Sequence, residues 1–466
     1  MIAKGALPDR IHCVGIGGGG LGPLAHMLAD AGHTVSGSDG APGFLPDALA
    51  ARGIAVARGH DPAHLGEAEL LIRSVAVPED NPEVIAARER DLPVLKYSEA
   101  LGRLMALRRG VAVAGTHGKT TTTAMVAHLL RGCGRDPAWL VGGAPLTLPS
   151  AANWGQGDAM VVEACEYDHS FLNLSYEIGA VTGVVPDHLD CFGDEAGVRE
   201  AFARFAARVP PGGTLVLGDG VPGDMSLPMN EGARSWHVQD HLHVDALRED
   251  ATGWSGMVEG GAWGRGEFRL PMLGRHNLDN LRVALLCVLA LDVPLWFALP
   301  HIATFTGVGR RLEDLGETDG SVPGVPAGVR VIDDFAHHPD ALSAAAEAAR
   351  ARFPGRRLVA VFQPHQVSRT EDFLPELAAA LGAFDETGLC DIFVARDRHP
   401  ERAGRMVEAL AGAAGGGVHR LGPATKADPA VAARLRPGDV CVIMGAGDID
   451  GLAARLVGAA AGPSVG

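Results

Sequence analysis

The stretch Val111-Ala-Val-Ala-Gly-Thr-His-Gly-Lys-Thr120 joins a short apolar run to a turn that contains glycine, lysine and threonine. The apolar run predicts a buried strand over 111–114, and the residues after the turn predict a helix from Thr121 to about Arg131. This order is typical of a phosphate-binding loop, in which glycines admit the phosphate, Lys119 supplies positive charge and the Thr120 hydroxyl can bind magnesium. The residues predicted to bind a nucleotide here are Gly115, Thr116, His117, Gly118, Lys119, Thr120 and Thr121.

The loop departs from the general phosphate-binding pattern, which has a glycine where Val113 stands. An ordinary turn between a strand and a helix therefore remains the alternative.

Two strand ends also bear on the hypothesis of a phosphate-binding loop. Glu163 ends the apolar run 159–163, where an acid near such a loop can hold magnesium; a solvated strand end is its alternative. His188 follows the next apolar run, 178–185, but magnesium prefers oxygen ligands and a lone histidine is more often structural.

A second glycine-rich turn, Gly15-Ile-Gly-Gly-Gly-Gly20, follows an apolar run near the amino terminus. It satisfies the G-x-G-x-x-G pattern, and Asp39 ends the next predicted strand about twenty residues later. By itself this pattern indicates a dinucleotide site, although any ligand with a pyrophosphate can use such a turn, and a turn without a ligand is the alternative. Two phosphate-binding turns in one chain predict two phosphorylated ligands, as in an ATP-driven reaction on a nucleotide-linked substrate.

Three polar segments in the second half of the chain add candidate site residues. Asn277 and Asn280, three residues apart at the start of a predicted helix, could contact an adenine edge or an amino acid, with helix capping as a nearly equal alternative. The segments 333–339 and 363–370 each follow a predicted strand. Ligand-binding groups of open α/β sheets usually lie at such strand ends, so the two segments together favour a site.

Composition and charge limit the classes of protein that this chain can be. Its 466 residues predict two to four domains, and its formal charge of −16 argues against a main task of binding nucleic acid or an anionic membrane. Seven scattered cysteines without a C-x-x-C pair favour a reducing compartment. The amino terminus lacks the apolar core of a signal peptide, and the longest apolar helix candidate, 283–291, is too short to span a membrane. We therefore expect a soluble, cytoplasmic protein, either a monomer or a homodimer.

Strands and helices alternate through three successive blocks, which predicts parallel sheets with helices on both faces. The expected strands of the third block are 329–332, 358–362, 392–394 and 440–444, after a glycine- and proline-rich loop or linker over 316–328. Residues 218–271 show no clear periodicity. The fold class predicted is therefore α/β with more than one doubly wound unit.

The motifs together resemble a known family. They are GIGGGG from Gly15, GTHGKTTTT from Gly115, PDHLD from Pro186, HNLDN from His276, GRRLE from Gly309, DDFAHHP from Asp333 and FQPH…SRT from Phe362, in one order across nearly the whole chain. In this combination the chain resembles the Mur ligases of peptidoglycan synthesis. The resemblance implies a Rossmann-like UDP-substrate domain (1–107), a central ATP-binding domain (108–310) and a Rossmann-like amino-acid-binding domain (311–466). It also implies an ATP- and magnesium-dependent ligase that joins the lactyl carboxylate of UDP-N-acetylmuramate to L-alanine through an acyl phosphate.

The resemblance assigns roles to individual residues. Lys119, Glu163 and His188 would be catalytic, and magnesium would be bound by Thr120, Glu163 and His188. The remaining ATP contacts would be Asn277, Asn280, Arg311, Asp334 and His338. The UDP-sugar would contact Gly15, Gly17, Gly18 and Asp39 with Ser74 and Asn81 nearby, and the amino acid would lie near His365 and Arg369.

Some positions depart from the family pattern and keep alternatives open. Cys165 stands where the family has an aspartate, Gly183 where it has an asparagine and Gln366 where it has an arginine. The first two leave open the surroundings of the metal site, and the third leaves open which amino acid is chosen. The alternative functions are a murein tripeptide recycling ligase acting on the same UDP-sugar, an NAD-dependent oxidoreductase, and a catalytically silent nucleotide-binding regulator.

Overall fold

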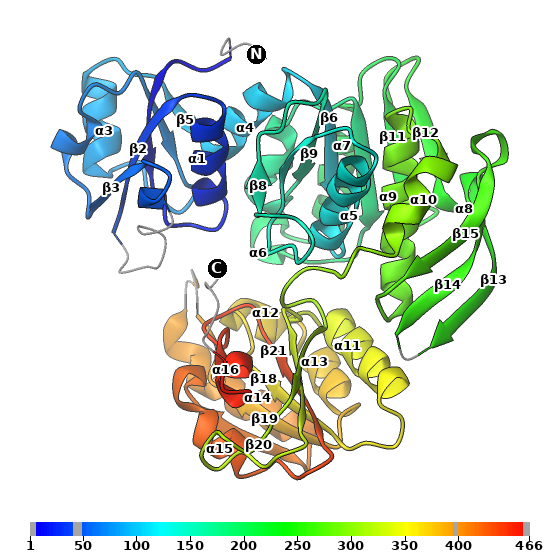
Figure 1. The fold of residues 1–466 in the computed structure, drawn as a ribbon. Helices are drawn as coiled ribbons and strands as arrows, with labels where there is room; N and C mark the ends of the chain where they lie inside the picture. The colour runs from blue at the N-terminus through cyan, green and yellow to red at the C-terminus, as the bar shows by residue number, and fades with distance from the viewer. Residues whose placement is uncertain (1–5, 41–48, 251, 395–396, 398, 460–466) are drawn as a thin grey trace. The chain divides into compact units, whose positions relative to one another are not determined.

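The computed structural model describes residues 6–40, 49–250, 252–394, 397 and 399–459. The chain divides into two compact units, of which the first comprises 1–247, 255–270 and 278–306 and the second comprises 248–254, 271–277 and 307–466. The ribbon in Figure 1 shows strands alternating with helices through both. None of the helices in the described part of the chain has the length and apolar character that a membrane crossing requires.

The amino-terminal sheet has five strands in the order β3-β2-β1-β4-β5, all parallel. The bounds are β1 Arg10–Val14, β2 Thr34–Asp39, β3 Ala55–Arg58, β4 Leu70–Arg73 and β5 Val94–Lys96. The strand order reverses between β1 and β4, and ligands of open α/β sheets bind outside the carboxyl ends of the strands at such a point. The glycine-rich turn after β1 and Ser74 after β4 therefore flank the expected binding position.

The central sheet of the first unit has seven strands in the order β12-β11-β10-β6-β9-β7-β8. The bounds are β6 Arg109–Ala114, β7 Ala138–Leu140, β8 Ala152–Asn153, β9 Ala159–Glu163, β10 Ile178–Gly183, β11 Thr214–Gly220 and β12 Arg234–His237. Strand β6 pairs in parallel with β9 on one side and with β10 on the other. The loop after β6, Glu163 at the end of β9 and the segment after β10 are thus neighbours at one sheet edge.

Residues 218–271, which lack periodicity in the sequence, contain a separate three-stranded sheet in the order β13-β14-β15. Its strands are β13 His243–Asp250, β14 Gly253–Glu259 and β15 Arg265–Leu270. Most side chains of β13 are exposed or half-buried, so the strand shows no strict alternation of apolar and polar residues from which it could be predicted.

The sheet of the second unit has six strands in the order β16-β17-β21-β18-β19-β20. The bounds are β16 Glu313–Glu317, β17 Arg330–Asp334, β18 Leu358–Phe362, β19 Glu386–Cys390, β20 Val418–Gly422 and β21 Val440–Met444. Along β18, Leu358, Ala360 and Phe362 pack into one apolar cluster, whereas Val359 and Val361 pack into another. Successive side chains of a strand point to opposite faces, so the two clusters show that both faces of the sheet are covered.

One expectation for this unit is wrong. The predicted strand 392–394 is not one: the strand is β19, which takes its register from β18, and residue Phe393 makes only a single bridge to His365. The pairing partner, rather than local hydrophobicity, decides here which residues form the strand. The predicted loop or linker 316–328 is confirmed over 318–328, while its first two residues end the antiparallel edge strand β16.

The helices cover the sheets in the alternation that the sequence predicts (Figure 1). Those of the first unit include α1 Leu21–Asp30, α3 Pro82–Glu89, α4 Tyr97–Met105, α5 Lys119–Gly132, α6 Leu189–Phe192, α7 Glu195–Ala206, α8 Val238–His241, α9 Arg275–Ala290 and α10 Leu295–Ile302. The first residues of α9 belong to the second unit. Those of the second unit include α11 Pro339–Arg352, α12 Val367–Asp372, α13 Leu374–Leu381, α14 Ala403–Ala414, α15 Asp428–Ala432 and α16 Leu452–Leu456. Short 3-10 turns include η1 Pro62–Leu65 and η2 Tyr167–Asn173.

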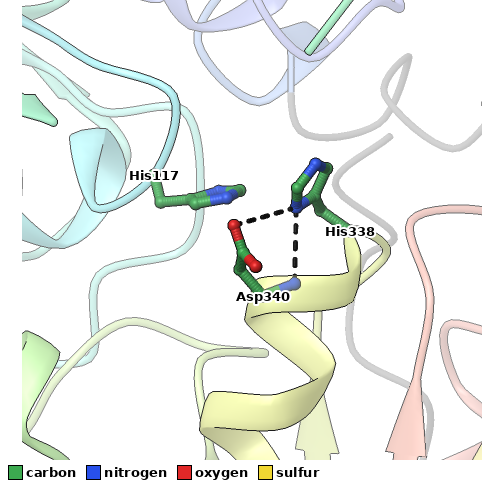
Figure 2. Close-up of side chains that lie close together, drawn as sticks. All are labelled: His117, His338 and Asp340. Carbon is green, nitrogen blue, oxygen red and sulfur yellow. Dashed lines mark hydrogen bonds and ion pairs between the residues drawn. The ribbon is translucent and has the colours of Figure 1, made fainter. Parts of the chain in front are cut away.

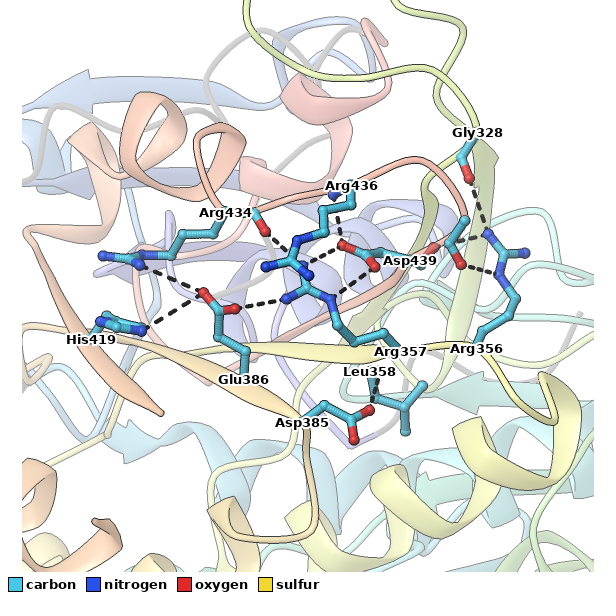
Figure 3. Close-up of polar contacts among 11 residues, drawn as sticks. Gly328, Arg356, Arg357, Leu358, Asp385, Glu386, His419, Arg434, Arg436 and Asp439 are labelled. Carbon is cyan, nitrogen blue, oxygen red and sulfur yellow. Dashed lines mark hydrogen bonds and ion pairs between the residues drawn. The ribbon is translucent and has the colours of Figure 1, made fainter. Parts of the chain in front are cut away.

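A polar network joins the amino ends of β18, β19 and β21, at the edge of the sheet opposite Asp334 (Figure 3). Arg357 donates to Asp439 Oδ1 at 3.0 Å, to Asp439 Oδ2 at 2.7 Å and to Glu386 Oε2 at 2.8 Å. Because one guanidinium binds carboxylates from two neighbouring strand ends, the network stabilises the strand order rather than a ligand site.

Candidate active site

The loop after β6 has the backbone that a phosphate-binding turn needs. Gly115 and Gly118 both have positive φ, 134° and 79°, and Gly118 directly precedes α5. A Cβ on Gly115 would lie 2.0 Å from Thr182 Oγ1, and one on Gly118 would lie 2.2 Å from Asn280 Oδ1. Both glycines are therefore required by backbone conformation and by space. The helix N-terminus after them presents backbone N–H groups, which favours an anionic ligand.

Lys119 lies within this loop and is held by oxygen atoms. Its Nζ donates to Gly115 O at 2.7 Å, to Thr116 O at 3.2 Å and to Glu166 Oε1 at 2.9 Å. Burial lowers the pKa of Lys119, but the charges of Glu166 and Glu163 and the hydrogen bond to Glu166 together outweigh burial, so the pKa is raised. Glu166 is itself buried. Glu166 has no predicted role in the sequence; its position three residues after Glu163 is the only signal for it.

The predicted magnesium ligands Thr120 and Glu163 lie together. Thr120 Oγ1 donates to Glu163 Oε1 at 3.1 Å, and the backbone N–H of Gly142 donates to Glu163 Oε2 at 2.8 Å. A Cβ on Gly142 would lie 2.6 Å from Glu163 Oε2, so this glycine, to which the sequence assigns no role, admits the carboxylate. A hydroxyl and a carboxylate, both oxygen donors, are the groups that magnesium prefers.

His188 follows β10 on a segment that is attached to the phosphate-binding loop. Thr116 Oγ1 donates to Val185 O at 3.0 Å, and the Val185 N–H donates back to Thr116 Oγ1 at 3.0 Å. His188 has a positive φ of 52°, and its ring packs edge-on against Tyr167 with centroids 5.3 Å apart. His117 and Thr121 complete this region: His117 O accepts from Thr182 Oγ1, and Thr121 is buried in α5.

The two asparagines lie inside α9, which begins at Arg275, so the capping alternative for them is wrong. Asn280 faces Gly118, as the 2.2 Å approach of its Oδ1 to a Cβ there shows. Asn277 is buried, and its Nδ2 donates to Leu273 O at 2.8 Å. The structure therefore brings Asn280 to the phosphate-binding loop and gives Asn277 a backbone contact.

The amino-terminal turn is closed by Asp39. The Gly17 N–H donates to Asp39 Oδ2 at 2.7 Å. Gly15 has a positive φ of 80°, and a Cβ on it would lie 3.0 Å from Ser74 Cβ. A Cβ on Gly18 would meet only Gly15 O, at 3.4 Å. Five of the predicted UDP-sugar residues thus surround one turn, and the sixth, Asn81, is the N-cap of α3, where its Oδ1 accepts from the backbone of residue 83 at 2.9 Å.

Tyr97 lies between this turn and the loop after β6 within the first unit. A Cβ on Gly20 would lie 3.4 Å from Tyr97 Cζ. Burial raises the pKa of the Tyr97 hydroxyl, and the charge of Glu163 raises it further. Lys96 next to it pairs with Asp168 at 2.8 Å, which holds the start of α4 against η2. Tyr97 therefore lies beside one predicted phosphate-binding turn and within electrostatic reach of the predicted magnesium ligand of the other.

In the second unit, the predicted ATP-site residues lie around the carboxyl end of β17: Asp334 ends the strand, His338 follows it and Arg311 precedes β16. Asp334 Oδ2 accepts from Leu312 N at 2.6 Å, and burial raises the pKa of Asp334 although Arg311 opposes this. The Arg311 guanidinium lies over the Phe335 ring, 4.5 Å from its centroid. His338 caps α11, where its Nδ1 accepts from the Asp340 N–H at 3.4 Å (Figure 2). Asp334, Arg311 and His338 are thus grouped at one end of the sheet.

The predicted amino-acid residues follow β18 at the same edge. Arg369 is buried in α12, and its Nη1 lies 3.1 Å from His365 Nδ1. The His365 ring stacks on Phe393 with centroids 5.6 Å apart. Gln366, which stands where the family has an arginine, has a positive φ of 69° directly before α12. The structure brings His365 and Arg369 together, and their contact with the amino acid stays a prediction.

The other two departures from the family pattern lie beside the ATP-binding loop. A Cβ on Gly183 would lie 3.1 Å from Gly220 Cα, so β11 passes close to this glycine, while Gly183 O accepts from Thr116 N at 2.9 Å. The neighbouring carboxylate of Glu166 raises the pKa of Cys165, which keeps its thiol protonated. A neutral group therefore stands where the family has a carboxylate.

Comparison with known proteins gives the same organisation. The family model described as "Mur ligase family, catalytic domain" matches residues 10–109, "Mur ligase middle domain" matches 113–288, and "Mur ligase, glutamate ligase domain" matches 321–447. The UDP-N-acetylmuramate–L-alanine ligase of Acidothermus cellulolyticus is 40% identical over 94% of this chain and 92% of its own length.

Two solved structures extend the comparison. The UDP-N-acetylmuramate-alanine ligase of Thermotoga maritima is 25% identical, covers 96% of this chain and 98% of its own, and has a TM-score of 0.78. The murein peptide ligase of Psychrobacter arcticus covers 97% of this chain and 98% of its own, with a TM-score of 0.72. At 22% identity it shows the fold alone.

Proposed function

Because this chain belongs to the Mur ligase family, we propose that its two glycine-rich turns serve one reaction, with the UDP-sugar at the first and ATP at the second. The protein is an ATP-dependent ligase that forms an amide between the lactyl carboxylate of UDP-N-acetylmuramate and L-alanine, a step of peptidoglycan precursor synthesis. Tyr97 carries the link between the two turns, since it contacts Gly20 and is influenced by the charge of Glu163.

The chemistry explains the need for two phosphate-binding turns. A carboxylate does not react with an amine in water, because it is a poor electrophile. A carboxylate oxygen therefore attacks the γ-phosphorus of ATP, the bond to the β-phosphate oxygen breaks, and ADP leaves an acyl phosphate behind. The amine of L-alanine attacks the acyl carbon, and the tetrahedral intermediate collapses to the amide and inorganic phosphate. The protein contributes mainly positioning and charge neutralisation.

Lys119 reduces the repulsion between the carboxylate and the polyphosphate. Its ammonium now contacts Glu166 and two loop carbonyls, so binding of ATP exchanges some of these oxygens for phosphate oxygens. The positive charge is secured throughout, because the neighbouring carboxylate raises the pKa of Lys119. Charge-assisted hydrogen bonds of this kind are about twice as strong as neutral ones.

The oxygen donors of the ATP-binding loop fit a magnesium ion. Thr120 and Glu163, already within 3.1 Å of each other, would hold it, with His188 as a further ligand. When bound, magnesium neutralises the charge of the phosphate oxygens. The Gly142 N–H fixes the second oxygen of Glu163 and so keeps the first turned toward Thr120.

The remaining assignments are part of the same proposal. The UDP-sugar contacts are Gly15, Gly17, Gly18, Asp39, Ser74 and Asn81. Asn277, Asn280, Arg311, Asp334 and His338 serve ATP, and His365 and Arg369 serve the amino acid. The domains divide as 1–107, 108–310 and 311–466, and we place the enzyme in the cytoplasm, where ATP and UDP-sugars are available.

One assay tests the proposal. Phosphate release is measured with ATP, magnesium and UDP-N-acetylmuramate, and with L-alanine, glycine, L-serine or the murein tripeptide as acceptor. We expect release that requires the UDP-sugar and is fastest with L-alanine. Release that is fastest with the tripeptide would instead identify a recycling ligase. An absorbance change with NAD and no phosphate release would identify an oxidoreductase.

A further inference from the structure

A buried carboxylate lies beneath the amino-terminal turn and has no part in the reaction described above. Glu83, on α3, has a side chain that is 0% exposed. Its ion pairs among the described residues are all with histidines. They are His12 Nε2 at 3.6 Å, His60 Nδ1 at 3.4 Å and His64 Nδ1 at 2.7 Å. Three imidazoles thus converge on one carboxylate.

Hydrogen bonds attach the same carboxylate to the surrounding elements. Ser38 Oγ, on β2, donates to Glu83 Oε2, and the backbone N–H of Asp61 donates to Glu83 Oε1 at 3.1 Å. His12, on β1, is in turn bonded through Nδ1 to Ser36 Oγ at 2.9 Å. Glu83 therefore joins β1, β2, the loop after β3, and η1 to the start of α3.

The charges at this site have to balance inside the protein. Burial raises the pKa of Glu83, but the hydrogen bonds from His12, Ser38, His64 and Asp61 lower it to about 2. The carboxylate is thus ionised, and a buried charge is stable only when it is paired. The groups that face it are His12 from β1, Ser38 from β2, His60 from the following loop and His64 from η1. Among these groups, the three imidazoles are the ones that can pair with the carboxylate as ions.

The network is directly attached to residues of the proposed UDP-sugar site. Ser38 is followed by Asp39, whose carboxylate accepts from Gly17 N at 2.7 Å and closes the glycine-rich turn. Asn81 caps the helix that carries Glu83. A Cβ on Gly40 would lie 3.2 Å from His60 Nε2, so the chain after Asp39 also packs against the network.

We propose that Glu83 is a positioning residue for the UDP-sugar: through its hydrogen bonds to Ser38 and the Asp61 backbone it fixes the end of β2 and the start of α3, and thereby Asp39 and Asn81. This inference rests on the proposed function. It predicts that loss of the carboxylate weakens binding of the UDP moiety. Affinity for ATP, whose loop lies on the other sheet, does not follow this change.

The test compares the wild type with Glu83→Gln, which keeps the shape of the side chain and removes its charge. Glu69→Gln is the matched control, since Glu69 is a partly exposed glutamate that pairs with Arg10 at the surface. Binding of UDP is measured by calorimetry, and KM and kcat are measured by phosphate release.

For Glu83→Gln we expect UDP binding and the KM for UDP-N-acetylmuramate to weaken about tenfold, with kcat and the KM for ATP nearly unchanged. Glu69→Gln should bind UDP as tightly as the wild type. If Glu83→Gln does not fold, Ser38→Ala, which removes one bond to the carboxylate, should give the same pattern more weakly.

Two results would overturn the inference: equal losses for UDP and ATP, or unchanged UDP binding in Glu83→Gln. Failure of the proposed function is a separate result. A wild type that binds UDP but releases no phosphate with any acceptor refutes the ligase assignment, while the UDP-binding arm still decides the role of Glu83.

Discussion

Replacing Lys119 by methionine tests the chemistry and the local stability of the ATP-binding loop at once. The Lys119 side chain is 15% exposed, its partner Glu166 is 4% exposed, and the Nζ–Oε1 distance is 2.9 Å. Methionine removes the charge and leaves Glu166 buried without its cation. Breaking one side of a buried pair costs about 3–5 kcal/mol, and Glu166 Oε2 already has no hydrogen-bond partner among the described residues. We expect a loss of unfolding free energy of that size.

The double variant Lys119→Met/Glu166→Gln separates stability from catalysis. A neutral glutamine needs no counter-charge, so most of the lost stability should return. Turnover should not return, because the missing ammonium neutralises phosphate charge. Removing one such group costs about a hundred- to a thousandfold in rate.

The assays are urea unfolding followed by fluorescence, and phosphate release with ATP, UDP-N-acetylmuramate and L-alanine. Glu166→Gln alone is the control, and it should keep its fold and measurable turnover. Near-normal turnover in Lys119→Met would refute the role of Lys119. A double variant as unstable as the single one would refute the argument that the uncompensated Glu166 causes the instability.

Three further predictions concern other parts of the molecule. Gly118→Ala should raise the KM for ATP at least tenfold, because its Cβ would lie 2.2 Å from Asn280 Oδ1. The control is Gly134→Ala, which also lies at positive φ but would have no atom within 4 Å of its Cβ. This control should affect stability only. Burial raises the pKa of Asp333 from 3.8 to about 6, so the folded state binds its proton more tightly than the unfolded state. Unfolding free energy should therefore rise as pH falls from about 6 to about 4, by up to about 3 kcal/mol, and Asp333→Asn should remove this rise, unlike Asp319→Asn at an exposed site. Arg357→Met should lower the free energy of unfolding by about 2–3 kcal/mol, because Asp439 and Glu386 lose their partner, and it should leave kcat/KM unchanged. The control Arg405→Met, at an exposed position, should not change stability measurably. A loss of activity in Arg357→Met at full stability would contradict this prediction.

Short-range features of the site could be predicted from the sequence. The turn 115–120, with Lys119 and Thr120 between a strand and a helix, forms from adjacent residues, so its spacing alone indicates the structure. Glu163 at the end of β9 and Asp39 at the end of β2 follow in the same way, because a run of apolar residues that ends in an acid predicts a strand and its last residue. The three-domain α/β fold and the family were predictable as well, since seven such motifs occur in one order.

Pairing partners could not be predicted in this way. Residues 392–394 are as apolar as a strand, yet β19 is formed by 386–390 because these residues pair with β18. Strand β13 has no strict alternation because its side chains are mostly exposed or half-buried. A strand is decided by its neighbour in the sheet, and the neighbour is chosen by the topology of the whole domain.

The sequence by itself thus determined the local phosphate-binding turns, the acids at the strand ends and the family. Tertiary structure alone decided which groups from distant parts of the sequence come together. Glu166 pairs with Lys119, the Gly142 N–H donates to Glu163, Tyr97 lies beside Gly20, and three histidines surround Glu83. The physical reason is that bonded geometry and periodicity act over a few residues, whereas these contacts join separate strands and loops. Their charges are balanced only once the sheets have formed, because burial is what makes each unpaired charge costly.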